Sequence, residues 1–468
     1  MIKTQKIRKF FPAIKSGRIV SNNAASTQVP IQLLNLLKKL IVQYDNVHRG
    51  QSVASLLTTA RFEASYDTIA QFIGASSRRN IILYRNATEA INSVMYSLMT
   101  EFKNGDNVVT TFMEHNSNYV PWYGLCREIL PKFGINVECR IAKFDKKTGE
   151  LDLAHLKSLV DKKTKLICCT GASNFLGTKN PIEKIRKIAH SSGYVQPNGE
   201  KKSYLLIDGA QIVPNTFIDV QKLDIDFLAW SFHKMLAPFG VGALYAREEL
   251  LKEMRPFLYG GDMIAEGKVS PEKVEYNALP WKFTAGTPNI LGTIISAQAL
   301  RLLIDFSLNP GQYKYFMTDK KLESSDVKKA MKNIELHERK LIGEALKILG
   351  RIPSIDIYGP KNTEDRISLV AFTCKHKSPF KIAEELKEMG VESRVGCHCA
   401  TLAHHYYKLN PPASCRISFY IYNNIEEVRK VCLAVKKCVQ LNNICPTKEN
   451  NILYKKQMNA NEIHTKVF

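Results

Sequence analysis

The 468-residue chain lacks a long hydrophobic run and has no regular pattern of cysteines. No uninterrupted apolar stretch reaches the ~18 residues needed to cross a bilayer. The chain starts with basic residues at Lys3, Lys6, Arg8 and Lys9, but no apolar segment follows them as it does in a secretory signal. The 11 cysteines do not show the spacing of a disulfide framework. We therefore expect a cytoplasmic protein in a reducing compartment, with no membrane partner.

Acidic residues are scarce relative to basic ones, so the formal net charge is +22. The lysines and arginines are scattered, with no long basic block and no aromatic residues interleaved among them. This distribution favours a solvated basic surface over a nucleic-acid site, and we expect no nucleic-acid partner. The apolar content of 45% is typical of a globular protein, and the length allows two or three domains.

Short apolar runs alternate with helical patterns between about residues 80 and 247. The runs cover residues 81–84, 107–112, 166–170, 204–207, 227–230 and 242–245. Between the first two, Ile91, Val94, Met95 and Leu98 recur at the spacing of one helix face. This alternation predicts an α/β domain with a mainly parallel sheet, whose active site forms at the carboxyl ends of the strands.

The rest of the chain predicts a smaller α/β domain and a tail. Residues 306–332 are rich in lysine and indicate a partly irregular connection. A helix is expected from about residue 333 to residue 349, ended by Gly350. Strand and helix patterns then alternate to about residue 441, and the polar composition after residue 442 indicates a loosely held tail.

Two residues at the ends of apolar runs indicate pyridoxal-phosphate chemistry. Asp208 follows the run 204–207, and Lys234 follows the run 225–230. Burial lowers the pKa of an amine and makes it usable for a Schiff base. A carboxylate beside the pyridine nitrogen keeps that nitrogen protonated, which makes pyridoxal phosphate an electron sink. Asp208 and Lys234 together are the arrangement that such an enzyme needs.

Further polar residues follow the same apolar runs. Ala87 and Thr88 open a helix, where free backbone N–H groups bind phosphate, although simple helix capping explains them as well. Ser231 and His233 could supply more phosphate donors. His115 could stack on a flat cofactor ring and shuttle protons, or could be a structural histidine. A sixth candidate, Asn174, could bond the cofactor's phenolic oxygen.

The segment from Arg394 to Ala400 is the most distinctive part of the C-terminal half. Cys397, His398 and Cys399, with two histidines nearby, resemble zinc ligands. One residue between the two cysteines is short of the usual ~2–4, so we predict no metal site. A reactive thiol beside Arg394 or His398 would instead be a nucleophile. Arg394 and Arg416 could grip a substrate carboxylate, or form surface ion pairs.

Together these segments resemble the class V aminotransferase family, and within it the SUF-type cysteine desulfurases and selenocysteine lyases. The resemblance runs from about Ile7 to about Leu441. Its landmarks are Asn23-Ala24-Ala25, Asn46-Val47-His48-Arg49-Gly50, Thr88-Glu89, Met113-Glu114-His115, Val120-Pro121-Trp122, Ser173-Asn174, Asp208-Gly209-Ala210-Gln211, Ser231-Phe232-His233-Lys234, Gly260-Gly261-Asp262-Met263-Ile264, Ala285-Gly286-Thr287-Pro288-Asn289, Arg394 to Ala400, and Cys415-Arg416.

The resemblance implies the pyridoxal-phosphate-dependent transferase fold type I, an α/β fold. Residues 21–300 would form a large cofactor-binding domain with a mainly parallel seven-stranded sheet. Residues 301–441 would form a smaller C-terminal α/β domain with the acceptor-cysteine loop. Residues 1–20 would pack on the small domain, and residues 442–468 would be the tail.

The resemblance also implies a role for each matched residue. Those expected to be catalytic are Lys234, Cys399 and His115. Pyridoxal 5'-phosphate would be bound covalently by Lys234, with Asp208 at the ring nitrogen and His115 on the ring face. Gln211 and Asn174 would contact the phenolic oxygen. The phosphate would be held by Ala87, Thr88, Ser231 and His233, joined by Thr287 from the other subunit of a homodimer. Those expected to bind substrate are Arg394, Arg416, His48 and Arg49.

The implied reaction converts L-cysteine to L-alanine. Lys234 removes the Cα proton, and the Cys399 thiolate attacks the substrate sulfur, which leaves a persulfide on Cys399. A SUF-type acceptor protein would take this sulfur for iron–sulfur cluster assembly or a related pathway. The alternatives are another class V enzyme, namely a selenocysteine lyase acting on L-selenocysteine, an aminotransferase or an epimerase, and a basic scaffold that binds nucleic acid or zinc without catalysis.

Four positions depart from the family pattern. Asn22 stands for an aspartate, Ala87 for a threonine and Thr284 for a glutamate. Backbone donation at residue 87 survives its change, so phosphate binding should persist. Cys397 stands for a histidine and adds a thiol that could join Cys399 in a disulfide or polysulfide, or tune the transfer. The segments 196–203 and 306–332 look longer than the family norm.

Overall fold

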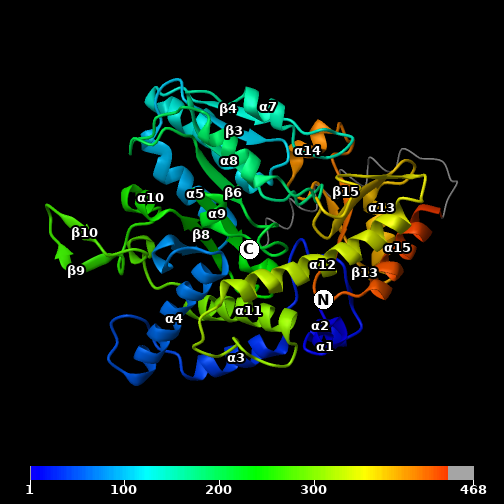
Figure 1. The fold of residues 1–468 in the computed structure, drawn as a ribbon, viewed down its shortest axis with the longest axis horizontal. Coiled ribbons are helices and arrows are strands. Elements are labelled where there is room, and N and C mark those ends of the chain that lie inside the picture. Colours follow the sequence, from blue (N-terminus) through cyan, green and yellow to red (C-terminus); the bar gives the residue numbers. More distant parts are fainter. Residues whose placement is uncertain (1, 441–468) are drawn as a thin grey trace, which may run out of the picture.

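The computed structural model describes residues 2–440 and places a seven-stranded sheet at the centre of the chain (Figure 1). The strand order is β2-β8-β7-β6-β5-β3-β4. β8 is antiparallel to both neighbours, and the other pairs are parallel. The strands are β2 (Ile81–Tyr84), β3 (Asn107–Thr111), β4 (Glu138–Ala142), β5 (Thr164–Thr170), β6 (Tyr204–Asp208), β7 (Phe227–Ser231) and β8 (Gly242–Ala246). The predicted sheet is therefore confirmed, while the predicted tail lies outside the described residues.

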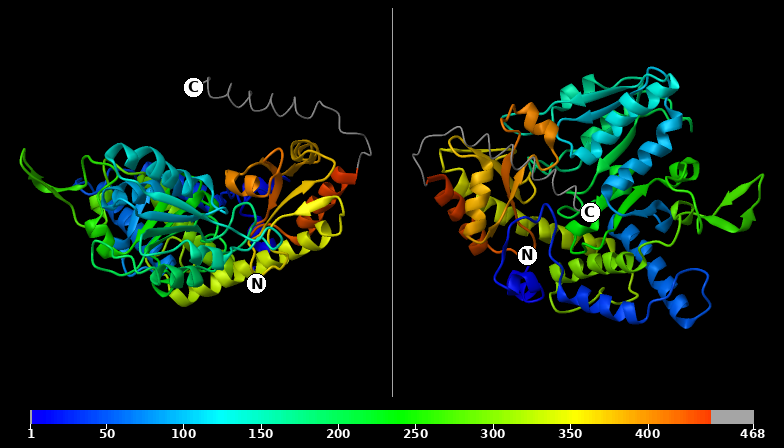
Figure 2. Two further views of the ribbon diagram at one scale, coloured as in Figure 1. Left: turned by 90° about the horizontal axis from the view of Figure 1, so that it is seen from above. Right: turned by 180° about the vertical axis from the view of Figure 1, so that it is seen from behind.

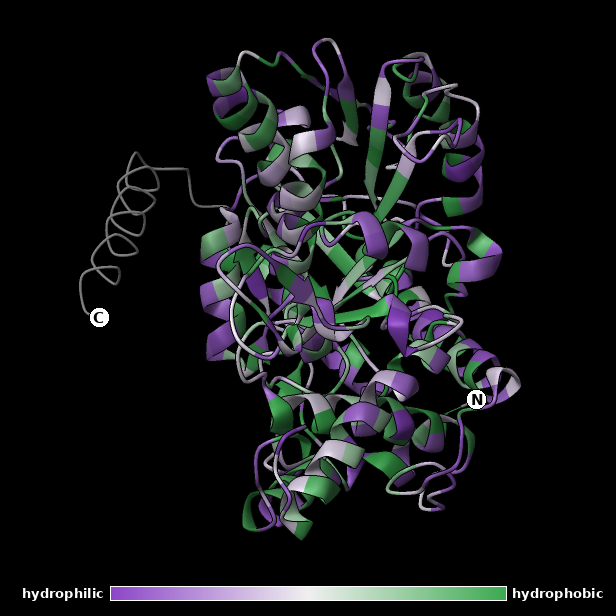
Figure 3. Cartoon of the chain, turned by 90° about the vertical axis from the view of Figure 1, so that its left-hand side faces the viewer, coloured by the Kyte–Doolittle hydropathy of each residue, from purple (hydrophilic) through white to green (hydrophobic). Residues whose placement is uncertain are grey.

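Helices cover both faces of this sheet, which is why its strands read as continuous apolar runs. In β5, Leu166 and Cys168 enter one hydrophobic core, and Ile167 and Cys169 enter the other. Hydrophobic residues accordingly line the central strands (Figure 3). The helices of this part are α3 (Ile31–Val42), α4 (Val53–Phe72), α5 (Ala87–Leu98), α6 (Val120–Gly124), α7 (Leu153–Ser158), α8 (Ile182–His190), α9 (Val220–Leu223), α10 (Glu248–Glu253) and α11 (Ile290–Leu308).

Helix α5 forms where the apolar periodicity predicts it. Asn86 caps its first turn by accepting a hydrogen bond from the Glu89 backbone N–H at 3.0 Å. Ile91, Val94 and Met95 are buried in the core on that face of the sheet. Because the cap and the apolar face agree, α5 begins at a defined residue beside the carboxyl end of β2.

A second, antiparallel sheet forms the smaller unit, in the order β11-β12-β15-β14. Its strands are β11 (Ile355–Ile357), β12 (Leu369–Cys374), β14 (Arg394–Gly396) and β15 (Ser414–Ser418), and its helices are α13 (Pro379–Glu388), α14 (Thr401–Tyr406) and α15 (Ile425–Gln440). The domain bounds stay predictions, but a separate hydrophobic core lies here.

Helix α12 (Ser324–Leu349) begins before the predicted residue 333. Its early residues Val327, Ala330 and Met331 enter the large core, while Leu341 and Ala345 enter the small one. The apolar spacing of a helix thus continues through the lysine-rich stretch, whose charges lie on the opposite face. The predicted irregular connection over residues 306–332 was too long, because α11 extends to residue 308 and α12 starts at residue 324.

Helix α11 is the one helix of residues 2–440 that is long and apolar enough to cross a membrane. Its apolar window is 89% buried inside the protein, as the core helix of a folded domain is. It packs against α3, α4 and α12. We therefore describe α11 as a core helix.

The N-terminal elements α1 (Thr4–Arg8) and α2 (Pro12–Lys15) lie beside the smaller unit (Figure 1). Arg8 forms an ion pair with Glu427 of α15 at 2.8 Å. β1 (Ile19–Val20) pairs in parallel with β13 (Val391–Glu392). A hairpin of β9 (Ile264–Val269) and β10 (Val274–Tyr276) projects from the opposite end of the protein (Figure 2).

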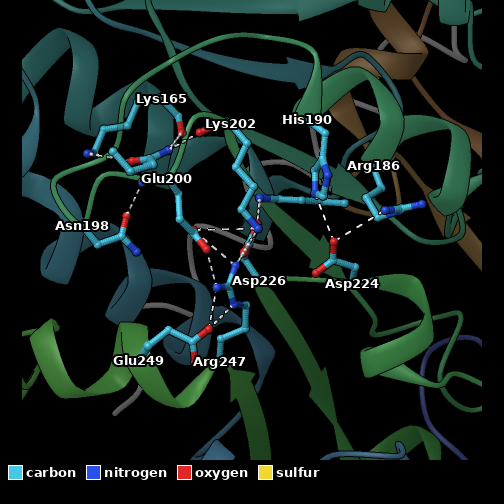
Figure 4. A network of polar contacts seen from close by, with 12 residues as sticks. Lys165, Arg186, His190, Asn198, Glu200, Lys202, Asp224, Asp226, Arg247 and Glu249 are labelled. Atoms are coloured by element: carbon cyan, nitrogen blue, oxygen red, sulfur yellow. Dashed lines mark hydrogen bonds and ion pairs between the residues drawn. The ribbon is translucent and has the colours of Figure 1, made fainter.

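The edge of the large sheet away from the carboxyl ends holds a buried polar network (Figure 4). Asp226, 1% exposed, accepts hydrogen bonds from Lys202 and Arg247, both at 2.9 Å. Burial raises the pKa of the Asp226 carboxyl, and the two cations oppose that shift. Glu200 also pairs with Arg247, and Gln196 donates to the carbonyl oxygen of residue 202 at 2.9 Å. The segment 196–203 is therefore anchored to the sheet.

Candidate active site

A cavity of about 230 Å³ lies between the large sheet and the smaller unit. One wall consists of residues at the carboxyl ends of the parallel strands, where a site was expected. The other wall comes from β14, β15 and the loop after β14. The lining residues are Ala24, Ala25, Asn86, Ala87, Thr88, His115, Ser117, Thr170, Ala172, Asn174, Asp208, Ala210, Gln211, Ser231, His233, Lys234, Arg394, His398, Cys399 and Arg416.

Lys234 ends a short 3-10 turn that follows β7 and opens onto the cavity. Its poorly solvated surroundings lower the pKa of the amine to about 8. The Asp208 carboxylate opposes this shift, while the charges of Arg416 and Arg394 add to it. A sizeable fraction of the amine is therefore neutral near pH 8 and is available as a nucleophile or a base.

Asp208 ends β6 and is 3% exposed. Its Oδ1 accepts a hydrogen bond from the Ala210 backbone N–H at 2.9 Å, and burial raises the pKa of its carboxyl. The next residue, Gly209, lies where a Cβ would be 2.7 Å from Leu228. A side chain at residue 209 would therefore collide with the core packed beside the strand end that presents the carboxylate.

The start of α5 forms one end of the cavity. Ser231 Oγ accepts a hydrogen bond from the Ala87 backbone N–H at 2.8 Å, and Thr88 Oγ1 lies 2.7 Å from Ser117 Oγ. Burial lowers the pKa of His233 to about 4, so its ring is neutral at pH 7. Asn86 does cap the helix, as the simpler interpretation required, and Ala87 and Thr88 of its first turn also line the cavity.

His115 follows β3 and projects into the same cavity. Its Nδ1 accepts a hydrogen bond from the Ser117 backbone N–H at 3.1 Å, which assigns the ring proton to Nε2. Burial, together with the Lys234 charge, lowers the pKa of His115 to about 4. The ring is therefore neutral and held in one orientation.

Glu114 has a positioning role that the sequence did not reveal. Its buried Oε1 accepts hydrogen bonds from Thr111 Oγ1 at 2.6 Å and from the Thr170 N–H at 2.9 Å. Its Oε2 accepts from Asn118 Nδ2 at 2.6 Å. Burial raises the pKa of Glu114 to about 8, and the carboxyl group ties the end of β3 to the end of β5. The sequence offered one hint of this contact, an acidic residue directly before the histidine. An acidic residue in such a position more often lies in a solvated loop.

Buried polar atoms lack partners where the two walls of the cavity meet. Arg416 is 2% exposed, and its Nη1 donates to the carbonyl oxygen of Asn174 at 2.7 Å. Asn174 Nδ2 donates to the carbonyl oxygen of His398 at 2.7 Å. Within residues 2–440, Arg416 Nε and Asn174 Oδ1 have no hydrogen-bond partner. Such orphaned groups beside a cavity indicate a ligand.

Arg394 and Arg416 face each other in register across β14 and β15. Burial lowers the pKa of Arg416 to about 9, and the Arg394 charge adds to that shift. In the described part of the chain neither arginine forms an ion pair with a carboxylate. The surface ion pair considered from the sequence is therefore not what these residues form.

Cys399 lies in a turn that is held from both sides. The Asn116 backbone N–H donates to the Cys399 carbonyl oxygen at 2.6 Å, and His398 Nε2 lies 3.0 Å from Ser414 Oγ. His398 and Cys399 have φ of +53° and +56°, a left-handed conformation that costs of order 1–3 kcal/mol per residue. The contacts from both sheets offset this strain. Among residues 2–440 no three metal-ligand side chains gather, and His404 also bonds Ser414.

Comparison with known proteins identifies the family of the chain. The sequence profile of the family "Aminotransferase class-V" matches residues 19–326 and 319–431. The chain belongs to this family. A cysteine desulfurase of Haloferax volcanii is 37% identical over 90% of this chain and 89% of its own, and one of Escherichia coli O7:K1 is 33% identical over 93% and 98%.

Solved structures of cysteine desulfurases are similar to this class V family member. One from Thermococcus onnurineus gives a TM-score of 0.80 at 28% identity, covering 94% of this chain and 98% of its own. One from Escherichia coli gives 0.78 at 27% identity, covering 94% and 99%. The predicted fold class, the transferase fold type I, is confirmed.

Three predicted residues of this family member do not line the cavity: His48, Arg49 and Thr287. His48 Nδ1 lies 3.4 Å from Asp262 Oδ2, and the ring packs on Trp281. The Arg49 side chain is 69% exposed and lies 4.0 Å from Asp262, and Thr287 is exposed. The loops that carry these residues run along the surface away from the cavity, so a single chain does not bring them to it.

Proposed function

We propose that this protein is a pyridoxal-phosphate-dependent cysteine desulfurase, which converts L-cysteine to L-alanine and holds the released sulfur on Cys399. The observation that carries the proposal is that a thiol, an amine and two arginines line one cavity: Cys399, Lys234, Arg394 and Arg416. An aminotransferase would need the amine and the arginines but not the thiol. Cysteine desulfurases among the relatives support the same reaction.

The residues of the large-sheet wall fit pyridoxal phosphate. Asp208 would pair with the ring nitrogen, His115 would lie on the ring face, and Lys234 would bind the cofactor covalently. The orphaned Asn174 Oδ1, with Gln211, suits the phenolic oxygen. Thr88, Ser231 and His233, which line the cavity, suit the phosphate, while the predicted backbone donor at Ala87 is bonded to Ser231 Oγ in this structure. When bound, pyridoxal phosphate withdraws electrons from the substrate Cα.

The substrate carboxylate would be held by Arg416 and Arg394. Both are cations without a carboxylate partner in the described chain, and the Arg416 Nε is a buried donor with nothing to bond. A planar guanidinium matches a carboxylate with two parallel hydrogen bonds. This pair would orient the amino acid so that its thiol points to Cys399.

Lys234 and Cys399 would carry the proton and the sulfur. The Lys234 amine, with a pKa of about 8, takes the Cα proton. The Cys399 thiolate then attacks the substrate sulfur, so that the Cys399 Sγ–S bond forms and the Cβ–S bond breaks. Protonation of the remaining carbon skeleton gives alanine, and the persulfide stays on Cys399.

Replacing Cys399 by serine tests this function. We expect the variant to keep its cofactor absorbance and to form no alanine from L-cysteine. An aminotransferase or epimerase would be indifferent to the change. A purified protein without cofactor absorbance would support the scaffold interpretation instead.

The chain is also proposed to act as a cytoplasmic homodimer. His48, Arg49, Asp262 and Thr287 lie away from the cavity of their own chain, and the hairpin β9–β10 projects with Val269 exposed. A second copy could receive these surfaces, and Thr287 would then reach the phosphate end of its partner's cavity. Light scattering of the purified protein checks the dimer. A SUF-type acceptor protein would take the sulfur for iron–sulfur cluster assembly.

A further inference from the structure

A second thiol lies on the turn that carries Cys399. The Ala400 backbone N–H donates to the Cys397 carbonyl oxygen at 2.8 Å, which closes a tight turn over residues 397–400. Gly396, with φ of +115°, leads into it. Two residues of chain span at most ~7 Å, so the Cα atoms of Cys397 and Cys399 lie close to the ~4.4–6.8 Å at which two cysteines can be joined.

The two thiols have different surroundings. Cys399 lines the cavity together with Lys234 and Arg416, whereas Cys397 is absent from its wall and is partly exposed. Both are free thiols. Both thiols are partly exposed, so the difference between them is that Cys399 lines the cavity and Cys397 does not.

Hydrogen bonds hold the backbone of the turn at His398 and at Cys399. Asn174 Nδ2 holds the carbonyl oxygen of His398 at 2.7 Å, and the Asn116 N–H holds that of Cys399 at 2.6 Å. The His398 ring is buried against Ser414. A sulfur atom bound to Cys399 must pass to another group to reach an outside acceptor, or the acceptor must enter the cavity.

We propose that Cys397 takes the transferable sulfur from Cys399 and presents it outside the cavity. This inference rests on the proposed desulfurase function. The Cys397 thiolate attacks the outer sulfur of the Cys399 persulfide, so that a Cys397 Sγ–S bond forms. The Cys399 Sγ–S bond breaks, and its electron pair leaves on the Cys399 thiolate. The proton on the outer sulfur stays there, and nothing is oxidised or reduced.

The geometry favours attack on the outer sulfur over attack on the inner one. A persulfide lengthens the Cys399 side chain by one S–S bond of ~2.05 Å. Attack on the outer atom therefore closes a larger and less strained ring than a direct bond between the two cysteines would. Because both thiols sit on one fixed turn, the exchange is intramolecular and has a high effective concentration.

The test follows the sulfur by peptide mass spectrometry in the full-length holoenzyme. Wild type, Cys397→Ser and Cys399→Ser are given one equivalent of L-cysteine without reductant, and their thiols are alkylated at successive times. Alanine is measured in the same samples. Sulfide release to added dithiothreitol is then followed in each protein. Cys374→Ser is the matched control, because Cys374 is a partly exposed free thiol at the end of β12 and outside the cavity.

We expect the extra sulfur in wild type to appear on Cys399 and then on Cys397. In Cys397→Ser it should stay on Cys399, alanine should form in the first turnover, and sulfide release should slow at least ~10-fold because an external thiol replaces the internal one. The Cys374→Ser protein should match wild type.

Extra sulfur that never reaches Cys397 in wild type overturns the relay, as does release from Cys397→Ser at the wild-type rate. A Cys397–Cys399 disulfide formed with loss of hydrosulfide overturns it as well. If Cys399→Ser still makes alanine, or wild type makes none, the proposed function itself fails, and the alanine assay separates that outcome from failure of the relay alone.

Discussion

Replacing Gly242 by alanine tests whether the close approach of β8 to α5 builds the phosphate end of the cavity. A Cβ at residue 242 would lie 2.4 Å from the Asn86 carbonyl carbon and 2.9 Å from the Ala87 nitrogen. Carbon atoms in contact normally lie ~3.5–4.0 Å apart, so β8 and the first turn of α5 must separate by ~1 Å. The obstacles are backbone atoms, so no side-chain rotation relieves the clash.

The separation has a cost in stability and a cost in binding. Overpacking of this kind destabilises by ~1–3 kcal/mol. The shift also weakens the 2.8 Å hydrogen bond from the Ala87 N–H to Ser231 Oγ. A displacement of ~1 Å in positioning groups lowers catalysis by ~100-fold. We therefore expect a lower free energy of unfolding and a pyridoxal-phosphate affinity reduced at least ~10-fold, because misplaced N–H donors are lost to the phosphate.

Absorbance titration of the apoprotein measures the affinity, and urea unfolding measures the stability. Gly124→Ala is the matched control, because a Cβ there meets no atom within 4 Å and helical alanine is favoured by ~0.5–1 kcal/mol. A Gly242→Ala protein that binds cofactor and unfolds like wild type would refute the reasoning.

Three further predictions concern charged residues. Asp226→Ala removes a buried acceptor of hydrogen bonds from Lys202, Arg247 and the Leu205 backbone N–H, and should cost at least ~2 kcal/mol in urea unfolding without changing the cofactor spectrum. In contrast, Glu249→Ala, whose side chain is 54% exposed, should cost less than ~1 kcal/mol. The rate at which the apoprotein binds pyridoxal phosphate should rise as the pH passes through about 8, because only the neutral Lys234 amine attacks the aldehyde. Stopped-flow absorbance measures this rate, and a rate that stays constant between about pH 6.5 and about pH 9.5 would contradict the prediction. Arg416→Lys should raise the KM for L-cysteine ~10-fold or more, because lysine lacks the planar guanidinium that makes two parallel hydrogen bonds to a carboxylate. A KM equal to that of wild type would show that Arg416 does not bind the substrate carboxylate.

The local sequence pattern indicated six of the seven strands of the main sheet and the residues at its carboxyl edge, and it missed β4, whose residues are mostly only partly buried at the edge of the sheet. Apolar runs buried on both faces identify parallel strands, and the carboxyl ends of parallel strands meet at one edge. Asp208, Lys234 and His115 could therefore be placed together before any coordinates were known. Periodicity also predicted α5, but it misjudged the start of α12, because the charges of that stretch hid an apolar face that enters the large core.

The opposite wall of the cavity depended on tertiary structure. Arg416, Asn174 and His398 meet only when the small antiparallel sheet packs against the carboxyl edge of the large one, and no local spacing encodes that approach. The same is true of the orphaned atoms that indicate a ligand, of the buried hydrogen bonds of Glu114, and of the separation of Cys397 from the cavity that Cys399 enters. Residue order along a strand determines which side chains share an edge, because the backbone geometry of a sheet is regular. Which distant surfaces meet depends on how the two cores pack, and that information is spread over the whole chain.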